Sequence, residues 1–267
     1  MQSLPKDFTL ENRIIDNKDK ITVFDTSSYI DLKRKNIDLS AILRKEEKGI
    51  KSFVSLWVLS ELLQEEDSIT LMNVNKHCFD KNCGWRFLAD PVSQIYVSLY
   101  GEEPVYIMKI KSEIEALFNK AVHVGLSKEE RENIKLQLEG AGKLFASYSS
   151  KVNKISSGEL RREVIRQTID EAKRLRRDFT PITNDSVEFF MQGFPGAGAH
   201  YEYIFKNKFQ NLHAPNRDKL MHDQRDWTLM FYAGRDNVYV VTGEKKFKTL
   251  GLKKVMGLDQ YLCEIGR

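Results

Sequence analysis

Short, mostly apolar runs followed by helix-like stretches constrain the fold of this chain more than any other feature of its sequence. The clearest runs are residues 21–24 (ITVF), 52–55 (SFVS) and 238–241 (VYVV), with a weaker one at residues 253–256 (KKVM). Strands buried on both faces have such continuous apolar runs, whereas strands with one face in water alternate apolar and polar residues. The pattern therefore predicts an α/β fold in which a buried, mainly parallel sheet is covered by helices on both faces.

The stretch between the two ends, about residues 67–200, has a different sequence pattern, in which helix-like segments dominate. This pattern predicts a mostly helical insertion. Three helices are expected within it, at about residues 104–122, 127–149 and 157–177. The segment 193–198 (GFPGAG) is expected to form a loop, because glycine and proline at that density interrupt both helices and strands. We therefore expect one domain over residues 1–267, with its core elements at about 20–66 and 201–267.

The composition indicates where in the cell the protein is located, but it does not indicate which reaction the protein catalyses. Of the 267 residues, 41% are hydrophobic and 30% are charged, which favours a folded globular protein over a disordered one. The three cysteines, Cys78, Cys83 and Cys263, are too few for a disulfide framework and fit a reducing cytoplasm. No apolar run approaches the ~18–20 residues that cross a bilayer, and the first residues lack the pattern of a secretory signal. We expect a cytoplasmic protein with no membrane association, whose net charge of +4 permits a polyanionic partner without requiring one.

Acidic residues occur at comparable places after the predicted strands. Asp25 follows the first strand directly, and Glu61 lies early in the helix after the second. Asp226 begins a helical segment that leads into the strand 238–241. Side chains at the carboxyl ends of parallel strands meet at one edge of a sheet, so these carboxylates are expected to lie together. A divalent cation would relieve their repulsion, and oxygen ligands suit Mg²⁺ or Mn²⁺, which can promote phosphodiester hydrolysis.

Four segments resemble, in the same order, the motifs of the PIN-domain (PIN-like) family of metal-dependent ribonucleases. They are VFDTSSYI (residues 23–30), LSELL (59–63), DWTL (226–229) and VVTGEKKF (240–247). The resemblance covers about half of the chain. It implies a three-layer α/β/α sandwich with a central, mainly parallel sheet, and Mg²⁺- or Mn²⁺-dependent cleavage of single-stranded or structured RNA.

The resemblance also implies roles for individual residues. Catalytic roles carried over by position fall on four acids: Asp25, Glu61, Asp226 and Glu244. The first three would bind the metal, and Asp223, which shares a helix face with Asp226, would replace or supplement the fourth. Ser27 and Thr242 would orient ligands or a water and contact the substrate. The alternatives without a functional role are a structural ion pair for Glu61, a surface charge for Glu244 and a helix-terminus charge for Asp223.

A strip of basic residues on the expected helix 157–177 is a second candidate for substrate contact. Its members are spaced by four, seven and four residues along one face: Arg162, Arg166, Lys173 and Arg177. Such a strip could hold the phosphate backbone of RNA. Because Glu159 and Asp170 share that face, a solvent-facing set of ion pairs is the favoured interpretation.

The resemblance predicts a metal-dependent endoribonuclease, with toxin, defence and RNA-processing roles all open. Its expected partners are an RNA substrate, a second copy of the chain in a homodimer, and an antitoxin or regulatory protein. The alternative hypothesis is a catalytically weak or inactive PIN-like module that binds RNA or protein. It is favoured by Glu244, because the family usually has aspartate there. A haloacid-dehalogenase-type phosphatase is disfavoured, since the position of its second aspartate is occupied by Ser27.

Overall fold

The computed structural model describes residues 20–37, 42, 49–64, 68–80, 84–102, 104–134, 157–204 and 226–266. At its centre is a five-stranded sheet with the order β5-β2-β1-β6-β7, in which every neighbouring pair is parallel. The strands are β1 (Lys20–Phe24), β2 (Ile50–Ser55), β5 (Phe87–Leu88), β6 (Val238–Val241) and β7 (Val255–Met256). A separate antiparallel pair joins β3 (Phe79–Asp80) to β4 (Gly84–Trp85).

The central strand β1 explains why the apolar runs are continuous. Its residue Ile21 pairs with Lys51 of β2 on one side and with Val238 of β6 on the other. All four residues of β6 are buried, as are the last four of β1. Neither strand has a face in water, so neither needs alternating polar residues. The prediction of a buried parallel sheet is confirmed.

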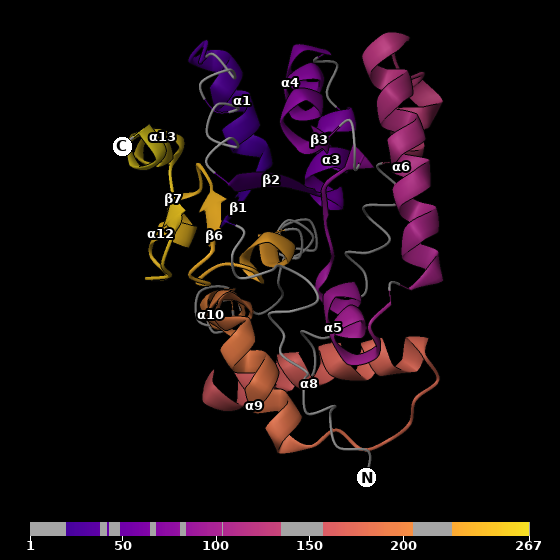
Figure 1. Ribbon diagram of the computed structural model, residues 1–267, viewed down its shortest axis with the longest axis vertical. Coiled ribbons are helices and arrows are strands. Elements are labelled where there is room, and N and C mark those ends of the chain that lie inside the picture. Colours follow the sequence, from indigo (N-terminus) through magenta and orange to yellow (C-terminus); the bar gives the residue numbers. More distant parts are fainter. Residues whose placement is uncertain are drawn as a thin grey trace, which may run out of the picture.

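Helices lie on both sides of the sheet. They are α1 (Thr26–Arg34), α3 (Leu56–Gln64), α4 (Ser68–Cys78), α5 (Pro91–Tyr100), α6 (Val105–His123), α8 (Ser157–Leu175), α9 (Asn184–Gly193), α10 (Pro195–Ile204), α12 (Lys245–Lys248) and α13 (Leu258–Gly266). Figure 1 shows α1, α4 and α13 on one side, and α8, α9 and α10 on the other. Among the described helices, none has the length and apolar character needed to cross a membrane.

The middle of the chain is mostly helical, but it also supplies part of the sheet. Helices α6 and α8 lie where they were expected, and residues 128–134 are helical, while 135–156 lie outside the described residues. The edge strand β5 was not foreseen, although it lies inside the range 67–200 and pairs with β2. A sheet strand therefore comes from the region expected to be an insertion.

The expectation of a loop at residues 193–198 was wrong, because α10 begins at Pro195. Proline is well tolerated in the first turn of a helix, where its missing N–H would have no intrahelical partner. Gly196 is required for packing: a Cβ there would lie 1.9 Å from the backbone oxygen of Met230 and 2.7 Å from that of Ala233. The glycine thus lets α10 approach the segment that begins at Asp226.

Candidate functional site

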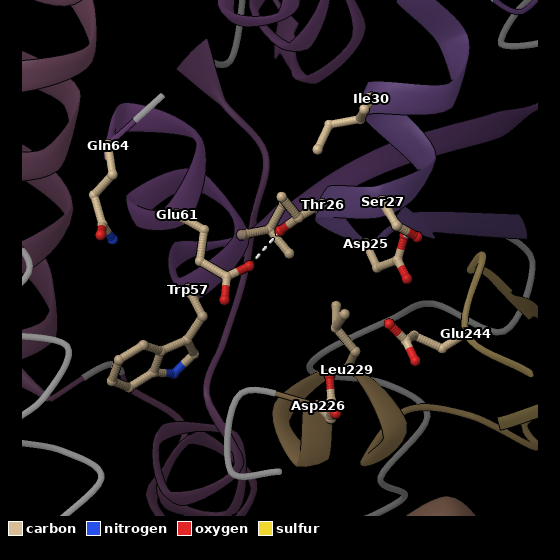
Figure 2. A pocket seen from close by; sticks show the side chains of 11 residues that line it. Asp25, Thr26, Ser27, Ile30, Trp57, Glu61, Gln64, Asp226, Leu229 and Glu244 are labelled. Atoms are coloured by element: carbon tan, nitrogen blue, oxygen red, sulfur yellow. Dashed lines mark hydrogen bonds between the residues drawn. The ribbon is translucent and has the colours of Figure 1, made fainter. Parts of the chain in front are cut away.

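Four acidic side chains from separate parts of the chain line one pocket of about 390 Å³. The pocket is lined by Asp25, Thr26, Ser27, Ile30, Trp57, Val58, Glu61, Gln64, Asp226, Leu229 and Glu244. It lies at the carboxyl ends of the three adjacent strands β2, β1 and β6. Figure 2 shows Asp25, Glu61 and Glu244 around a common space, with Asp226 at its lower edge. The acidic side chains therefore lie at one edge of the sheet, as the parallel topology predicted.

Asp25 follows the last residue of β1 and is the N-cap residue of α1. Its Oδ1 atom accepts hydrogen bonds from the Ser28 backbone N–H (2.7 Å) and the Ser27 hydroxyl (2.9 Å), and its Oδ2 atom accepts one from the Thr242 hydroxyl. Asp25 is only 6% exposed. Burial raises the pKa of its carboxyl above the ordinary value, and the hydrogen bonds oppose that rise. A buried carboxylate with neutral donors gains from a nearby positive charge, so this position favours a cation.

Ser27 and Thr242 tie the start of α1 to the turn after β6. The Ser27 hydroxyl accepts a hydrogen bond from the Gly243 backbone N–H (3.0 Å) while it donates to Asp25. The Thr242 hydroxyl accepts one from the Glu244 backbone N–H (3.0 Å) while it donates to the other oxygen of Asp25. A Cβ at position 243 would lie 2.7 Å from the Ser27 Oγ atom, so only glycine permits this approach. Both oxygens of Asp25 are thereby held in a fixed direction.

Glu61 reaches the pocket from the middle of α3. One of its carboxylate oxygens accepts a hydrogen bond from the Thr26 hydroxyl, which belongs to the first turn of α1. Thr26 and Asp25 are neighbours, so one turn of α1 positions two of the acids. Figure 2 shows this hydrogen bond across the pocket.

Asp226 forms an ion pair with Lys246 of α12. The two side chains are 21% and 23% exposed, so both are largely withdrawn from water. The Lys246 Nζ atom also lies 4.9 Å from the centre of the Phe247 ring, and Phe247 is buried. One of the four acids thus already has a cationic partner.

Glu244 occupies the fourth acidic place, at the end of the turn after β6. It is the N-cap residue of α12, but its side chain makes no capping hydrogen bond. Its side chain is exposed and lines the pocket. The extra methylene relative to aspartate gives this carboxylate more reach and more freedom than the carboxylate of Asp25.

The donor set suits a hard divalent cation in kind, because carboxylate and hydroxyl oxygens are the ligands that Mg²⁺ and Mn²⁺ prefer. As the side chains stand, however, no three acidic, histidine or cysteine groups in the described part of the chain are gathered closely enough to hold a metal ion. Asp226 is turned to Lys246, and Glu61 to Thr26. Binding a cation would require these side chains to turn towards Asp25.

The basic strip of α8 does not reach the pocket. Arg162 pairs with Glu188 at 2.6 Å, and Arg166 pairs with Glu163 at 3.1 Å. Lys173 is buried and pairs with Asp178 at 2.6 Å. These contacts agree with the interpretation of α8 as an ion-paired face. Asp223, the further ligand candidate, lies outside the described residues.

Sequence reasoning missed two pocket features. Lys246 was not identified, since its contact with Asp226 depends on how two segments pack. Trp57 lies four residues before Glu61 on α3, a spacing that puts both side chains on one helix face. That spacing could have predicted an aromatic side chain beside the acid.

Sequence reasoning also missed a second strand-end aspartate, Asp90, which shortly follows β5 and is the N-cap residue of α5. Its Oδ1 atom accepts hydrogen bonds from the backbone N–H groups of Val92 (3.0 Å) and Ser93 (3.1 Å), and its Oδ2 atom accepts one from the Ser93 hydroxyl. Burial raises the pKa of this carboxyl too. The sequence signal was Asp90-Pro91, a capping residue before a proline in the first helical turn.

No protein-family model, curated protein or solved structure matches this chain.

Proposed function

We propose that this protein is a metal-dependent endoribonuclease with a PIN-like fold. The observation that carries the proposal is the pocket, in which four carboxylates meet at the carboxyl ends of adjacent parallel strands. Within the described part of the chain, no basic residue lines it. Lys246 lies beside the pocket and pairs with Asp226. Gathering the other like charges at the same place costs stability, so a purely structural reason for the arrangement is weak. The order of the four motifs along the chain supports the same class.

Asp25, Glu61 and Asp226 would hold the divalent cation, with Glu244 as the candidate for a second. When bound, Mg²⁺ or Mn²⁺ supplies polarisation of the phosphodiester, an activated water and charge stabilisation on the departing oxygen.

The residues of the chain itself position these groups. The hydroxyls of Ser27 and Thr242 hold both oxygens of Asp25, so that this carboxylate needs little reorganisation before it acts. Glu61 is held by Thr26, whereas the exposed Glu244 has the freedom to meet a water or a second cation.

A partly buried aromatic side chain supports a nucleic acid as the substrate. Trp57 lines the same pocket as the acids, as does Gln64, which lies about two turns further along the same helix. An unpaired base can stack on an aromatic side chain whatever its identity, which suits single-stranded RNA or an RNA loop. A homodimer and an antitoxin or regulatory protein belong to the proposal through the resemblance to PIN-domain ribonucleases, and a cytoplasmic location belongs to it through the low cysteine count.

The second candidate function is an RNA- or protein-binding module that does not cut. One observation favours it: Asp226 is paired with Lys246, and the acids are not gathered around a metal position in the described residues. In that case the lysine would serve as the permanent counter-ion of the pocket.

The experiment is cleavage of a panel of single-stranded and structured RNAs with Mn²⁺, Mg²⁺ or EDTA. Wild type is compared with Asp25→Asn and with Asp185→Asn, which changes an exposed acid in the first turn of α9. Metal-dependent cutting that disappears only in Asp25→Asn supports the nuclease. Wild type that cuts no RNA, yet binds it equally with Mn²⁺ and with EDTA, supports the binding module.

A further inference from the structure

A cation of the chain's own, the ammonium group of Lys246, pairs with Asp226 at the edge of the pocket. The lysine lies on the short helix α12, immediately after the acidic turn that carries Glu244. Its Nζ atom reaches Asp226, which begins a different segment, and forms an ion pair with it. Each partner is less than a quarter exposed, so the pair is better shielded from water than the surface pairs of α8.

An ammonium group and a divalent cation that share one carboxylate at close range weaken each other's binding. Two positive charges near each other repel, and the repulsion is stronger in a partly buried pocket than in water. Asp226 is also a proposed metal ligand, so Lys246 and the metal compete for it. We infer that Lys246 occupies the cation position at Asp226 in the metal-free protein, and that a divalent cation binds by displacing it.

This inference rests on the proposed function, and it assigns Lys246 a positioning role rather than a catalytic one. While no metal is bound, the lysine neutralises one of four acids and fixes the direction of the Asp226 side chain. When the metal arrives, the flexible four-carbon stem lets the ammonium group swing away without movement of α12. The ion pair of Lys246 with Asp226 therefore stabilises the metal-free protein and weakens metal binding, because it has to be broken when the metal binds.

The decisive measurement is Mn²⁺ affinity, determined by isothermal titration calorimetry on the full chain. Lys246→Met keeps the length of the stem and removes the charge, and it should tighten Mn²⁺ binding roughly three- to tenfold. Lys245→Met removes the same charge from the neighbouring, exposed position of α12 and should change the affinity less than about twofold.

Two further variants distinguish displacement of Lys246 from Asp226 from a general effect of removing a positive charge. Lys246→Arg keeps the positive charge and should leave Mn²⁺ affinity near the wild-type value. In an Asp226→Asn background, Lys246→Met should no longer tighten binding, because the contested carboxylate is absent. Thermal unfolding in EDTA gives an independent readout: Lys246→Met should lower the midpoint, and saturating Mn²⁺ should raise the midpoint more for this variant than for wild type.

The outcomes separate the inference from the proposed function. If wild type binds Mn²⁺ through Asp25 and Lys246→Met binds it no more tightly than Lys245→Met, the inferred displacement is wrong and the metal site stands. If neither wild type nor Lys246→Met binds Mn²⁺, the metal site and the displacement both fail. If only Lys246→Met binds Mn²⁺, the displacement inferred for wild type is wrong, and the lysine is the permanent counter-ion that keeps the cation out.

Discussion

Asp25 and Asp90 occupy equivalent places in the fold, yet their surroundings differ. Each lies at or just beyond the carboxyl end of a parallel strand, each is the N-cap residue of the next helix, and burial raises the pKa of each carboxyl. The hydrogen bonds to Asp90 come from the first turn of its own helix. Asp25 also accepts one from Thr242, 217 residues later, and faces an open pocket with three other acids.

The comparison teaches that a buried acid with a raised pKa is not by itself a mark of function. A half-buried capping aspartate shows a pKa raised in the same direction as that of a candidate metal ligand, because burial of the carboxyl is the main cause in both. What distinguishes the two aspartates is the set of groups that surround each carboxylate. Near Asp90 is the buried hydroxyl of Tyr232, whose oxygen lies at hydrogen-bond distance from the Ala89 carbonyl (2.7 Å) and the side-chain Oε1 of Gln94 (2.8 Å).

The largest expected difference between the two aspartates is in catalysis. Asp25→Asn should reduce RNA cleavage at least about a hundredfold, because a neutral amide cannot balance a divalent cation. Asp90→Asn should leave cleavage within about twofold of wild type, since asparagine caps a helix as well as aspartate does. Initial rates with Mn²⁺ on one RNA measure both. Equal losses in the two variants would break the distinction.

A smaller difference is expected in stability. Asp90→Ala removes the cap of α5 and should lower the free energy of unfolding by about 0.5–2 kcal/mol, or about 1–4 °C in the unfolding midpoint. Asp25→Ala should lower it less in EDTA, because the lost cap is offset by removal of a buried charge beside other acids. Urea unfolding at pH 7 measures both variants. A greater loss for Asp25→Ala would show that the cap outweighs the charge at that position.

The smallest expected effect is a slope in stability with pH. Because the pKa of Asp25 is raised in the folded protein, the folded state holds this proton more tightly than the unfolded chain. Its contribution to stability is therefore present below the ordinary pKa of 3.8 and is lost as pH rises through the folded-state value. In EDTA, the midpoint of wild type minus that of Asp25→Asn should fall from about pH 4 upwards. A difference that stays flat between pH 4 and 8 would contradict the raised pKa.

The strands that carry the pocket could be predicted because their sequence pattern is a direct consequence of their surroundings. Residues 21–24 and 238–241 are buried from both sides of the sheet and therefore apolar throughout. Strand β5 has only two residues, too few for any period to show. The helix α10 was not foreseen for a different reason: its glycines serve close packing rather than a turn, Gly196 against Met230 and Ala233, and Gly198 against Arg161.

Part of the candidate site could also be predicted, because it follows from the parallel arrangement of the strands. Asp25, Glu61 and Glu244 follow three adjacent strands, so the parallel topology alone brings them to one edge. The ion pair of Asp226 with Lys246 depends on how a helix of four residues sits against another segment. No local sequence pattern encodes that contact, and the role of the lysine became visible only with the structure.

The pairing of β1 with β6 also has a consequence for the order of events during synthesis. Asp25 and the hydroxyl of Thr242 that holds it are 217 residues apart. At about 5–20 residues per second, roughly 10–40 s separate the appearance of the first from that of the second. Throughout that interval β1 lacks one of its two neighbours, and the acidic pocket does not yet exist. A ribosome making this protein therefore carries a chain without an assembled site until translation has passed the turn at Glu244.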